Sequence, residues 1–344
     1  MFNWLFGEKS NTQIGVDLGS SSIKIVELGR KDERPYLVNY ALAQVKSGAV
    51  FSVIDLPDEE IVKILKALIG EAKMASRRAS VALPVDKTFS TVISLPAMPA
   101  NELAAAVFFE AQKYVPVPLE EVVLDWTVIS NAADLRGFDA RINAEGSNPP
   151  LQGGQSPKGS IGGASAGDGV SGSASAQAIQ ILLLAVPKEI INRITNIVSQ
   201  AGLKVAALEQ EAFSLARSLV GNDKNTFMVI DLGRRGTDII VLDQGFIKLS
   251  HNLESVNKEI ILMEIDRIVN IFQMRYNKKI GQCLLAGGRA NEKELADFLS
   301  LKLKIPVKVG DPFARVGHNQ AVAGFLKELA PQLAVATGLA MRDN

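Results

Sequence analysis

Cysteine and long apolar runs are both scarce in this sequence. The single cysteine, Cys283, cannot form an internal disulfide bond, as is typical of proteins from a reducing compartment. The longest apolar runs, such as Ile179 to Val186, have the length of a strand and fall well short of the roughly 20 residues that span a bilayer. We therefore predict no membrane span. No Cys/His/Asp cluster has the spacing of metal ligands, so we also predict no structural metal site.

An excess of charge of either sign is also missing. Lys+Arg and Asp+Glu number 37 each, which gives a formal net charge of zero. This balance argues against a nucleic-acid partner and against attraction of the whole protein to anionic lipid. Apolar residues make up 47% of the 344 residues, enough for two domains that each have a core.

One segment, Gly146 to Gln177, differs in composition from the rest of the chain. Glycine and serine fill half of its positions, so it has very little apolar surface to bury. Extended patterns, Val122 to Ile129 and Ala178 to Val186, flank it on either side. We therefore predict a disordered loop that joins two strands of one domain, because closure entropy grows only slowly with loop length.

The remaining sequence alternates between the patterns of strands and helices, which predicts an α/β chain with mixed sheets. The expected helices span residues 58–74, 101–114, 188–201, 210–219, 258–276 and 292–302. The expected strands include residues 80–83, 88–95 and 283–286.

Two segments that lie 214 residues apart align without a gap. Residues 17–25 read DLGSSSIKI and residues 231–239 read DLGRRGTDI, and each follows a short apolar strand. Such a repeat indicates a duplicated domain with two equivalent hairpins. Glycine lets the backbone approach a phosphate, and hydroxyl and N–H groups can bind its oxygens. A third turn, Gly287-Gly288, follows an apolar strand and leads into a helix, as is needed where the backbone packs against a flat base.

These motifs resemble those of the type IV pilus assembly PilM family, in the FtsA/PilM branch of the actin-like ATPase superfamily. The resemblance extends along nearly the whole chain. It includes GVDLGSSSIKIVEL, SLPAMPANELAAAVFFEAQKYVPVP, LLLAVPKEIINRITNIVSQAGL, DPFARV and ATGLAMR. It implies an actin-like, ribonuclease H-like duplicated fold, with two domains around a nucleotide cleft and an inserted subdomain of the FtsA/PilM type.

The resemblance also implies a division of the chain. The expected parts are an N-terminal segment (1–12), a domain-one core (13–78 and 181–220), an inserted subdomain (79–180), a domain-two core (221–257 and 281–344) and a shortened upper subdomain helix (258–280).

Carried onto this chain, the resemblance implies a site for ATP and Mg²⁺. The cofactor-binding residues would be Asp17, Gly19, Ser20, Ser21, Ser22, Lys24, Asp231, Gly233, Thr237, Gly287 and Gly288. Asp17 and Asp231 would hold Mg²⁺ through water, and Glu209 would face the γ-phosphate as the catalytic candidate.

The chain departs from the family pattern after the second hairpin. PilM-like sequences usually continue with an arginine, a Gly-Gly pair and a helix that contacts the nucleoside, whereas residues 251–258 read HNLESVNK. We therefore expect a shortened upper subdomain and fewer adenosine contacts. Arg234 and Arg235 stand where small residues are usual, and the sequence leaves open whether they contact phosphate or point into solvent.

The resemblance implies a cytoplasmic, ATP-binding scaffold of the type IV pilus, or a related secretion, inner-membrane platform. The expected partner is the cytoplasmic N-terminal peptide of a PilN-like single-span membrane protein, which would hold this chain at the inner membrane. Other proteins of the platform are further candidate partners, and ATP hydrolysis is expected to be weak or absent. The alternatives are a sugar-type kinase, for which we find no sugar-binding run, and an FtsA-like filament protein, which would usually end in a basic amphipathic helix.

Overall fold

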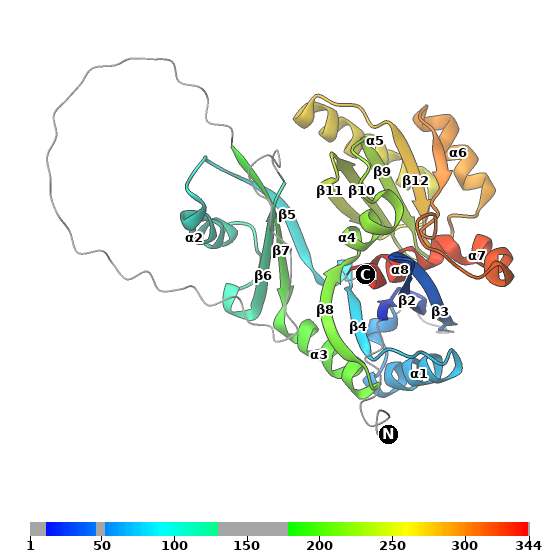
Figure 1. Cartoon of the computed structure of the whole chain (residues 1–344). Coiled ribbons are helices and arrows are strands. Elements are labelled where there is room, and N and C mark those ends of the chain that lie inside the picture. Colours follow the sequence, from blue (N-terminus) through cyan, green and yellow to red (C-terminus); the bar gives the residue numbers. More distant parts are fainter. Residues whose placement is uncertain (1–11, 46–51, 130–177, 343–344) are drawn as a thin grey trace, which may run out of the picture.

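The computed structural model describes residues 12–45, 52–129 and 178–342, which form three β-sheets with flanking helices (Figure 1). The first sheet has the order β3-β2-β1-β4-β8. Its strands are β1 (Gln13–Leu18), β2 (Ser22–Lys31), β3 (Arg34–Gln44), β4 (Arg78–Leu83) and β8 (Lys204–Gln210). β2 is antiparallel to its neighbours β1 and β3, and β4 and β8 continue the sheet in parallel with β1.

The second sheet repeats this topology, with the order β11-β10-β9-β12-β13. Its strands are β9 (Phe227–Leu232), β10 (Thr237–Asp243), β11 (Phe246–Leu253), β12 (Gln282–Ala286) and β13 (Val307–Val309). Again three antiparallel strands are followed by two parallel ones. The predicted duplication and the two predicted hairpins are confirmed, and the fold is actin-like.

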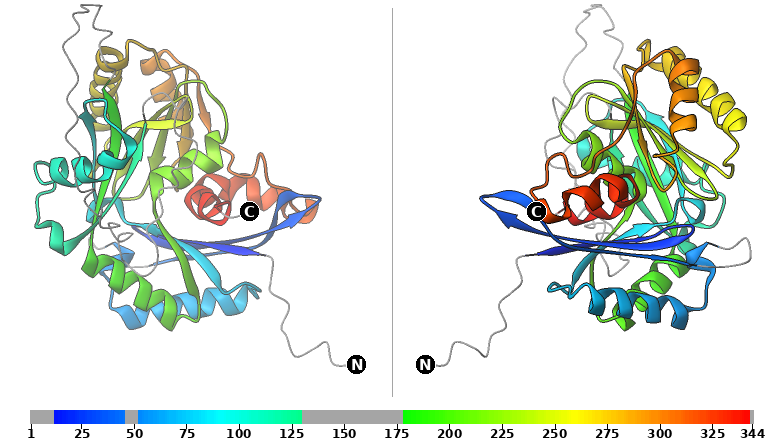
Figure 2. Two further views of the ribbon diagram at one scale, coloured as in Figure 1. Left: turned by 60° about the vertical axis from the view of Figure 1, so that its left-hand side comes forward. Right: turned by 90° about the vertical axis from the view of Figure 1, so that its right-hand side faces the viewer.

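Helices cover both faces of the first sheet (Figure 2). On one face α1 (Asp58–Glu71) and α3 (Lys188–Gln200) bury the stripes of their apolar residues, including Ile61, Leu65, Ile194 and Ile197. On the other face lies α8 (Ala334–Ala340), where a Cβ on Gly15 of β1 would clash with the backbone of the helix. Only glycine permits this close contact, which fixes α8 against the sheet.

The second sheet has α5 (Lys258–Tyr276) and α6 (Lys293–Leu303) on one face. Its other face packs against α8 and α4 (Glu211–Leu215), and α4 continues into a π-helical turn, Ala216–Val220. The expected helix 210–219 thus corresponds to residues 211–220, but its second half is π-helical and more widely wound than an α-helix. α7 (Ala323–Leu329) packs with α8 against the outer part of the first sheet.

The third sheet has the order β5-β7-β6, with β5 (Phe89–Leu95), β6 (Val122–Val128) and β7 (Ile179–Pro187), and is covered by α2 (Ala100–Ala111). The two strands predicted on either side of the Gly/Ser-rich segment are β6 and β7, and the structure pairs them as antiparallel neighbours. The segment itself, Gly146 to Gln177, lies outside the described residues.

The strand pairings move the expected edges of the inserted subdomain. Residues 79–83 were expected in the insertion, but they belong to β4 and pair with β1 in the first sheet. Residues 181–187 were expected in the domain-one core, but they belong to β7 and pair with β5 and β6. The insertion therefore begins after Leu83 and ends at Pro187, because pairing partners, which a local pattern does not reveal, decide which sheet a strand joins.

Candidate nucleotide site between two facing hairpins

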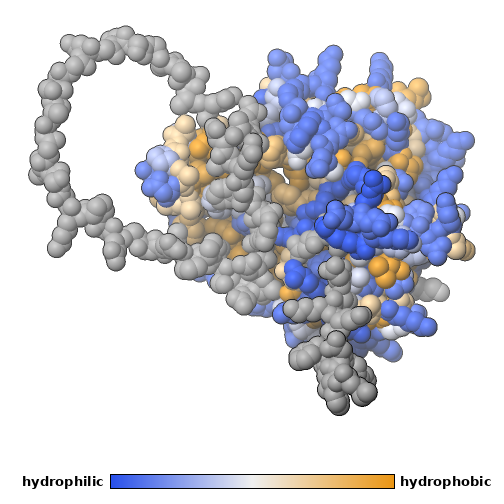
Figure 3. Space-filling view, in the orientation of Figure 1, coloured by the Kyte–Doolittle hydropathy of each residue, from blue (hydrophilic) through white to orange (hydrophobic). Residues whose placement is uncertain are grey.

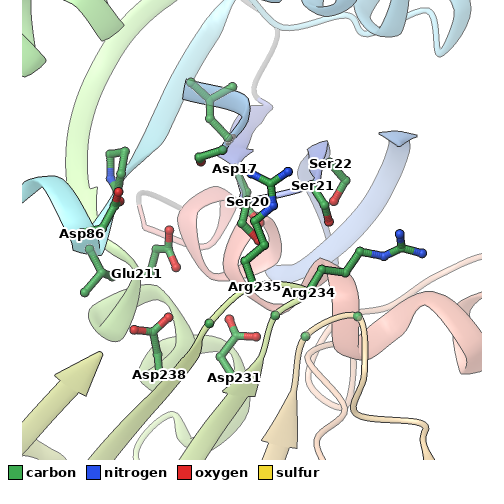
Figure 4. A pocket seen from close by; sticks show the side chains of 18 of the residues that line it. Asp17, Ser20, Ser21, Ser22, Asp86, Glu211, Asp231, Arg234, Arg235 and Asp238 are labelled. Atoms are coloured by element: carbon green, nitrogen blue, oxygen red, sulfur yellow. The ribbon is translucent and has the colours of Figure 1, made fainter. Parts of the chain in front are cut away.

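The β1–β2 and β9–β10 hairpins face each other across a polar cavity of about 460 Å³ (Figure 4). This volume is in the range of small-molecule sites. The cavity is lined from domain one by the first hairpin and by residues 84–86, and from domain two by the second hairpin, by Asn252 and Glu254 and by Gly287 and Gly288. Within the part of the chain that the structure describes, no aromatic side chain lines it.

The first hairpin carries a buried ion pair. The Nζ atom of Lys24 donates to Oδ2 of Asp17 at 2.8 Å, and the Asp17 side chain is only 3% exposed. Burial opposes the charge of Lys24, but the charge and hydrogen bond of Asp17, together with the charges of Asp231 and Glu211, outweigh it and raise the pKa of Lys24. The backbone N–H of Gly19 donates to the carbonyl of Ser22, so the turn presents Ser20 and Ser21 to the cavity. This hairpin neutralises its own carboxylate.

The second hairpin places two carboxylates side by side. Asp231 and Asp238 are directly opposite each other in the β9–β10 register. Burial raises the pKa of Asp231 to about 7, and the adjacent Asp238 carboxylate adds to the shift. Burial likewise raises the pKa of Asp238 to about 6, although Nδ2 of Asn252 donates to its Oδ1 at 2.8 Å. Two ionised carboxylates on directly paired residues repel each other, so a cation bound beside the pair would be favoured.

Glu211, the first residue of α4, adds a third carboxylate to this group. Figure 4 shows its side chain turned toward the same space as those of Asp231 and Asp238. Burial raises the pKa of Glu211 well above its usual range, and the nearby aspartates raise it further. Three partly buried carboxylates therefore line the same cavity, close enough to Lys24 for its charge to act on Glu211 and Asp231.

The Gly287-Gly288 turn closes the domain-two side. Gly287 has φ of +87°, and a Cβ there would clash with the Asp231 carboxylate and the Leu232 carbonyl. A Cβ added to Gly288 would have Oε1 of Gln332 as its nearest neighbour, at 3.9 Å. The first glycine permits the close packing of β12 against β9, and the second leaves open space above the turn.

The cavity brings most of the predicted site residues together. Those that line it are Asp17, Ser20, Ser21, Ser22, Lys24, Asp231, Gly233, Gly287 and Gly288. Arg234 and Arg235, whose direction the sequence left open, line it too. Gly19 lies just behind the lining, where a Cβ would be 2.8 Å from Nζ of Lys24.

Thr237 does not reach the cavity, contrary to prediction. It is fully buried, and its hydroxyl donates to the carbonyl of Ser255 at 3.0 Å. Side chains alternate along a strand, so Thr237 and its neighbour Asp238 point to opposite faces of β10. Asp238, and not Thr237, lines the cavity. The sequence repeat aligns Asp238 with Lys24, and this alignment could have identified Asp238 as a site residue.

Glu209 was also wrongly placed by the sequence. Its carboxylate binds Arg217 at 2.8 and 2.9 Å and Arg342 at 2.7 Å, away from the cavity. β8, which had not been predicted, extends to Gln210, so the first residue beyond the strand end is Glu211. Recognition of β8 would have moved the assignment by two residues.

Asp86 is a further carboxylate that sequence reasoning missed. It lies in the short 3₁₀ turn Val85–Lys87, where the chain leaves the first sheet for the inserted subdomain. Lys87 binds it at 3.4 Å and binds Asp55 at 3.5 Å. Nothing in the local sequence marks this turn, because the order of strands brings it to the cavity.

These residues fit a magnesium–nucleotide complex. The carboxylates outnumber the cationic side chains in the lining, so a polyphosphate needs an accompanying cation to enter. Among the described residues, no group of three or more His, Cys, Asp or Glu side chains is arranged to hold a metal directly. Mg²⁺ commonly keeps several waters and is held through carboxylates and phosphates, which this donor set allows.

A second, smaller hollow of about 250 Å³ lies where the third sheet, α4 and the β10–β11 turn meet. Its apolar lining includes Leu182, Phe213, Phe246 and Ile247. Beside it, the buried ammonium group of Lys248 donates to the carbonyl of Ile129, which ties domain two to the inserted subdomain. Burial lowers the pKa of Lys248.

The repeated sheets and facing hairpins define this chain as a two-domain, actin-like protein with an inserted subdomain. The family model "Type IV pilus assembly protein PilM" matches residues 15–139 and 251–344, well over half of the chain. The chain belongs to this family.

One solved structure agrees with this fold. The chain is similar to one described as a PilM-PilN type IV pilus biogenesis complex, with 20% identity, a TM-score of 0.74 and coverage of 96% of this chain and 98% of that chain. A weaker likeness is to the ethanolamine utilization protein EutJ from Carboxydothermus hydrogenoformans, with 15% identity, 96% and 89% coverage and a TM-score of 0.49. No helix in the described ranges is both long and apolar enough to cross a membrane.

Proposed function

We propose that this chain is the cytoplasmic, ATP-binding scaffold of a type IV pilus inner-membrane platform, and that it docks the cytoplasmic N-terminal peptide of a PilN-like membrane protein. The observation that carries this proposal is the pair of facing hairpins around a polar cavity, in a chain of the PilM family. No helix among the described residues can span a membrane, so binding to this partner would hold the protein at the membrane.

Mg-ATP would bind with its phosphates between the two turns. Ser20, Ser21 and the backbone of residues 233–236 would donate hydrogen bonds to phosphate oxygens, and Arg234 would add a charge-assisted contact. Asp17 and Asp231 would orient the waters of the Mg²⁺ shell. Bound Mg²⁺ would supply the positive charge that lets a polyphosphate lie beside these carboxylates.

Glu211, rather than Glu209, would face the terminal phosphate. It begins α4 at the end of β8 and is grouped with Asp231 and Asp238. A carboxylate that retains its proton can donate to a phosphate oxygen, whereas an ionised one repels it. We expect hydrolysis to be weak, with Glu211 acting mainly as a sensor of the terminal phosphate.

The partner peptide would dock on the inserted subdomain. The apolar hollow beside Leu182 and Phe213 can take an apolar side chain of an extended peptide. The inserted subdomain also carries an apolar outer surface around α2, where Phe108 and Phe109 are 47% and 67% exposed (Figure 3). Large exposed aromatic residues often mark an interaction surface.

The nucleotide half is tested by titrating Mg-ATP into the full chain by calorimetry. Gly19→Val should abolish binding, because its side chain would displace Lys24 from Asp17 and distort the turn. Gly70→Val is the matched control, because an added Cβ there meets no atom within 4 Å. Equal affinity of the Gly19→Val variant and the wild type would refute the assignment.

The partner half is tested by titrating the cognate N-terminal peptide with and without Mg-ATP. Phe213→Ala should weaken peptide binding, while Phe325→Ala, which removes an equally large but more exposed side chain from α7, should not. Failure of the peptide to bind in both states would reject the scaffold and favour the kinase alternative.

A further inference from the structure

The chain passes between the two domains at two places. The first connection follows the π-helical turn Ala216–Val220 and leads through Gly221 into β9 of the second sheet. The second connection leaves β13, and its backbone is bonded to β12 of the second sheet at Gly310 and to β3 of the first sheet at Gly317. Any movement of one domain relative to the other must therefore bend these two connections.

The side chain of Arg315, in the second connection, lies directly against the first connection. Its Nη2 atom donates to the carbonyls of Arg217 and Ser218, at 2.6 and 2.9 Å. Both carbonyls belong to the π-helical turn, and the last carbonyls of a helix lack partners within it. The planar guanidinium also covers Gly221, where an added Cβ would be 2.7 Å from Cζ of Arg315. One side chain thus joins the two connections.

The backbone at Gly221 makes this contact possible. Gly221 has φ of +64° and ψ of −126°, a conformation that glycine adopts without strain. Its N–H donates to the carbonyl of Ala216 at 2.8 Å, which closes the π-helical turn. Such turns are rare and frequently occur at functional sites. Because glycine has no side chain, the guanidinium of Arg315 can lie on the backbone and reach both carbonyls.

The π-helical turn is itself fixed to domain one and to α8. The guanidinium of Arg217 binds the carboxylate of Glu209, at the end of β8, at 2.8 and 2.9 Å and donates to the carbonyl of Gly338 in α8 at 2.8 Å. Arg342 binds the same carboxylate at 2.7 Å. Arg315 therefore holds the second connection against a part of the molecule that is anchored on its other side.

The helical segment that Arg315 holds begins in the nucleotide cavity. Glu211 is the first residue of α4 and lines the cavity, and α4 continues directly into the π-helical turn. The walls of the cavity come from both domains, so its width depends on the angle between them. A side chain that keeps the two connections together restricts this angle, because the connections are where the domains can hinge.

We propose that Arg315 is a positioning residue, which clamps the two interdomain connections and keeps the cavity at the width that binds Mg-ATP. This proposal rests on the proposed nucleotide site and adds a residue that does not line the cavity. Without the clamp the domains sample a wider range of angles, and only the molecules with a correctly closed cavity bind. A fall of this fraction to about one tenth raises the apparent dissociation constant about tenfold.

The first test measures the spacing of the domains without nucleotide. Glu60→Cys in α1 and Glu294→Cys in α6 provide exposed positions for one spin label on each domain, and the native cysteine is buried. Double electron–electron resonance then gives the distribution of distances between the labels. Arg315→Met should broaden this distribution, because the angle between the domains is less restricted.

Arg77→Met is the matched control for the distance measurement. Arg77 is also exposed and also donates to two backbone carbonyls, at 2.8 and 2.9 Å, but both lie within domain one. Its loss should leave the distribution unchanged. A distribution as narrow in Arg315→Met as in the parent protein would overturn the clamp, and so would equal broadening in the two variants.

The second test is calorimetry of Mg-ATP binding to the full chain. Arg315→Met should weaken binding about tenfold, and Arg315→Lys, which keeps the charge but not the planar fork, should restore part of the affinity. Arg77→Met should stay within about twofold of the wild type. Circular dichroism establishes that each variant is folded.

A glycine pair gives an independent readout in the same titration. Gly221→Ala should weaken binding as Arg315→Met does, because the added methyl group displaces the guanidinium. Gly202→Ala is its control, since Gly202 also has a positive φ, of +86°, but an added Cβ there meets no atom within 4 Å. Wild-type affinity in both Arg315→Met and Gly221→Ala would overturn the clamp and leave the nucleotide site intact. Failure of the wild type to bind Mg-ATP would reject the nucleotide site, and the distance measurement would still decide whether Arg315 restrains the domains.

Discussion

The two hairpins that face the cavity have the same backbone but opposite charge at one equivalent position. In the first hairpin the partner across from Asp17 is Lys24, and in the second the partner across from Asp231 is Asp238. The first is a neutral pair that is complete without a ligand. The second is a pair of repelling carboxylates, and the cation that acts on Asp231 is Lys24 of the first hairpin. The two halves thus share one strand topology, but only the first hairpin pairs its buried carboxylate with a cation of its own.

The largest expected effect comes from breaking the neutral pair. Lys24→Met leaves Asp17 buried without its cation, and removal of one partner of a buried pair costs about 3–5 kcal/mol of unfolding free energy. Urea unfolding measures this cost, and Mg-ATP binding should be lost as well. Lys87→Met, which removes a half-exposed cation near the same cavity, should change stability by less than about 1 kcal/mol. Equal losses in the two variants would show that Lys24 has no special role.

The next effect is the pH dependence of the second hairpin. The pKa values of Asp231, about 7, and Asp238, about 6, lie above the ordinary value of 3.8. The folded state therefore binds more protons than the unfolded state between about pH 4 and 7, and stability falls as pH rises through this window. The unfolding free energy of the wild type should fall between pH 4.5 and 8 in the absence of Mg²⁺. For Asp231→Asn we expect this fall to be smaller, by on the order of 3 kcal/mol. Parallel stability profiles for the two proteins would contradict this account.

A smaller effect should follow from relieving the repulsion at constant pH. Asp238→Asn keeps the shape of the side chain and removes one of the two like charges. We expect a gain of about 1–2 kcal/mol at pH 8 and almost none at pH 5, where Asp238 is already largely protonated. Thermal or urea unfolding at the two pH values measures the difference. Asp297→Asn, an exposed position on α6, is the control and should show no gain at either pH.

The smallest effect is expected at Thr237, which occupies the position equivalent to Ile23 in the first hairpin. Thr237→Val removes the hydroxyl that donates to the Ser255 carbonyl, which should cost about 1 kcal/mol. Because this side chain points away from the cavity, the affinity for Mg-ATP should stay within about twofold. Ser20→Ala, at the turn that lines the cavity, should weaken binding about tenfold without a comparable loss of stability. A tenfold loss of affinity for Mg-ATP in Thr237→Val would show that Thr237 contributes to binding, and would contradict this prediction.

The sequence by itself determined the hairpins, the duplication and many of the residues that line the cavity between them. These features are local, since Asp17 to Lys24 and Asp231 to Asp238 are each one turn with its two adjoining strands, and an ungapped repeat makes both visible. The Gly287-Gly288 turn was also predicted from the sequence, because the glycine pair directly follows an apolar strand and leads into a helix.

Tertiary structure alone decided the parts that depend on strand order. The place of β8 beside β4 determines that Glu211, and not Glu209, reaches the cavity, and the parallel pairing of β4 with β1 brings Asp86 there. The pairing of β7 with β5 and β6 moved the boundary of that subdomain to Pro187. Such contacts join residues far apart in the chain, and their stability comes from burial and pairing that no short stretch of sequence contains.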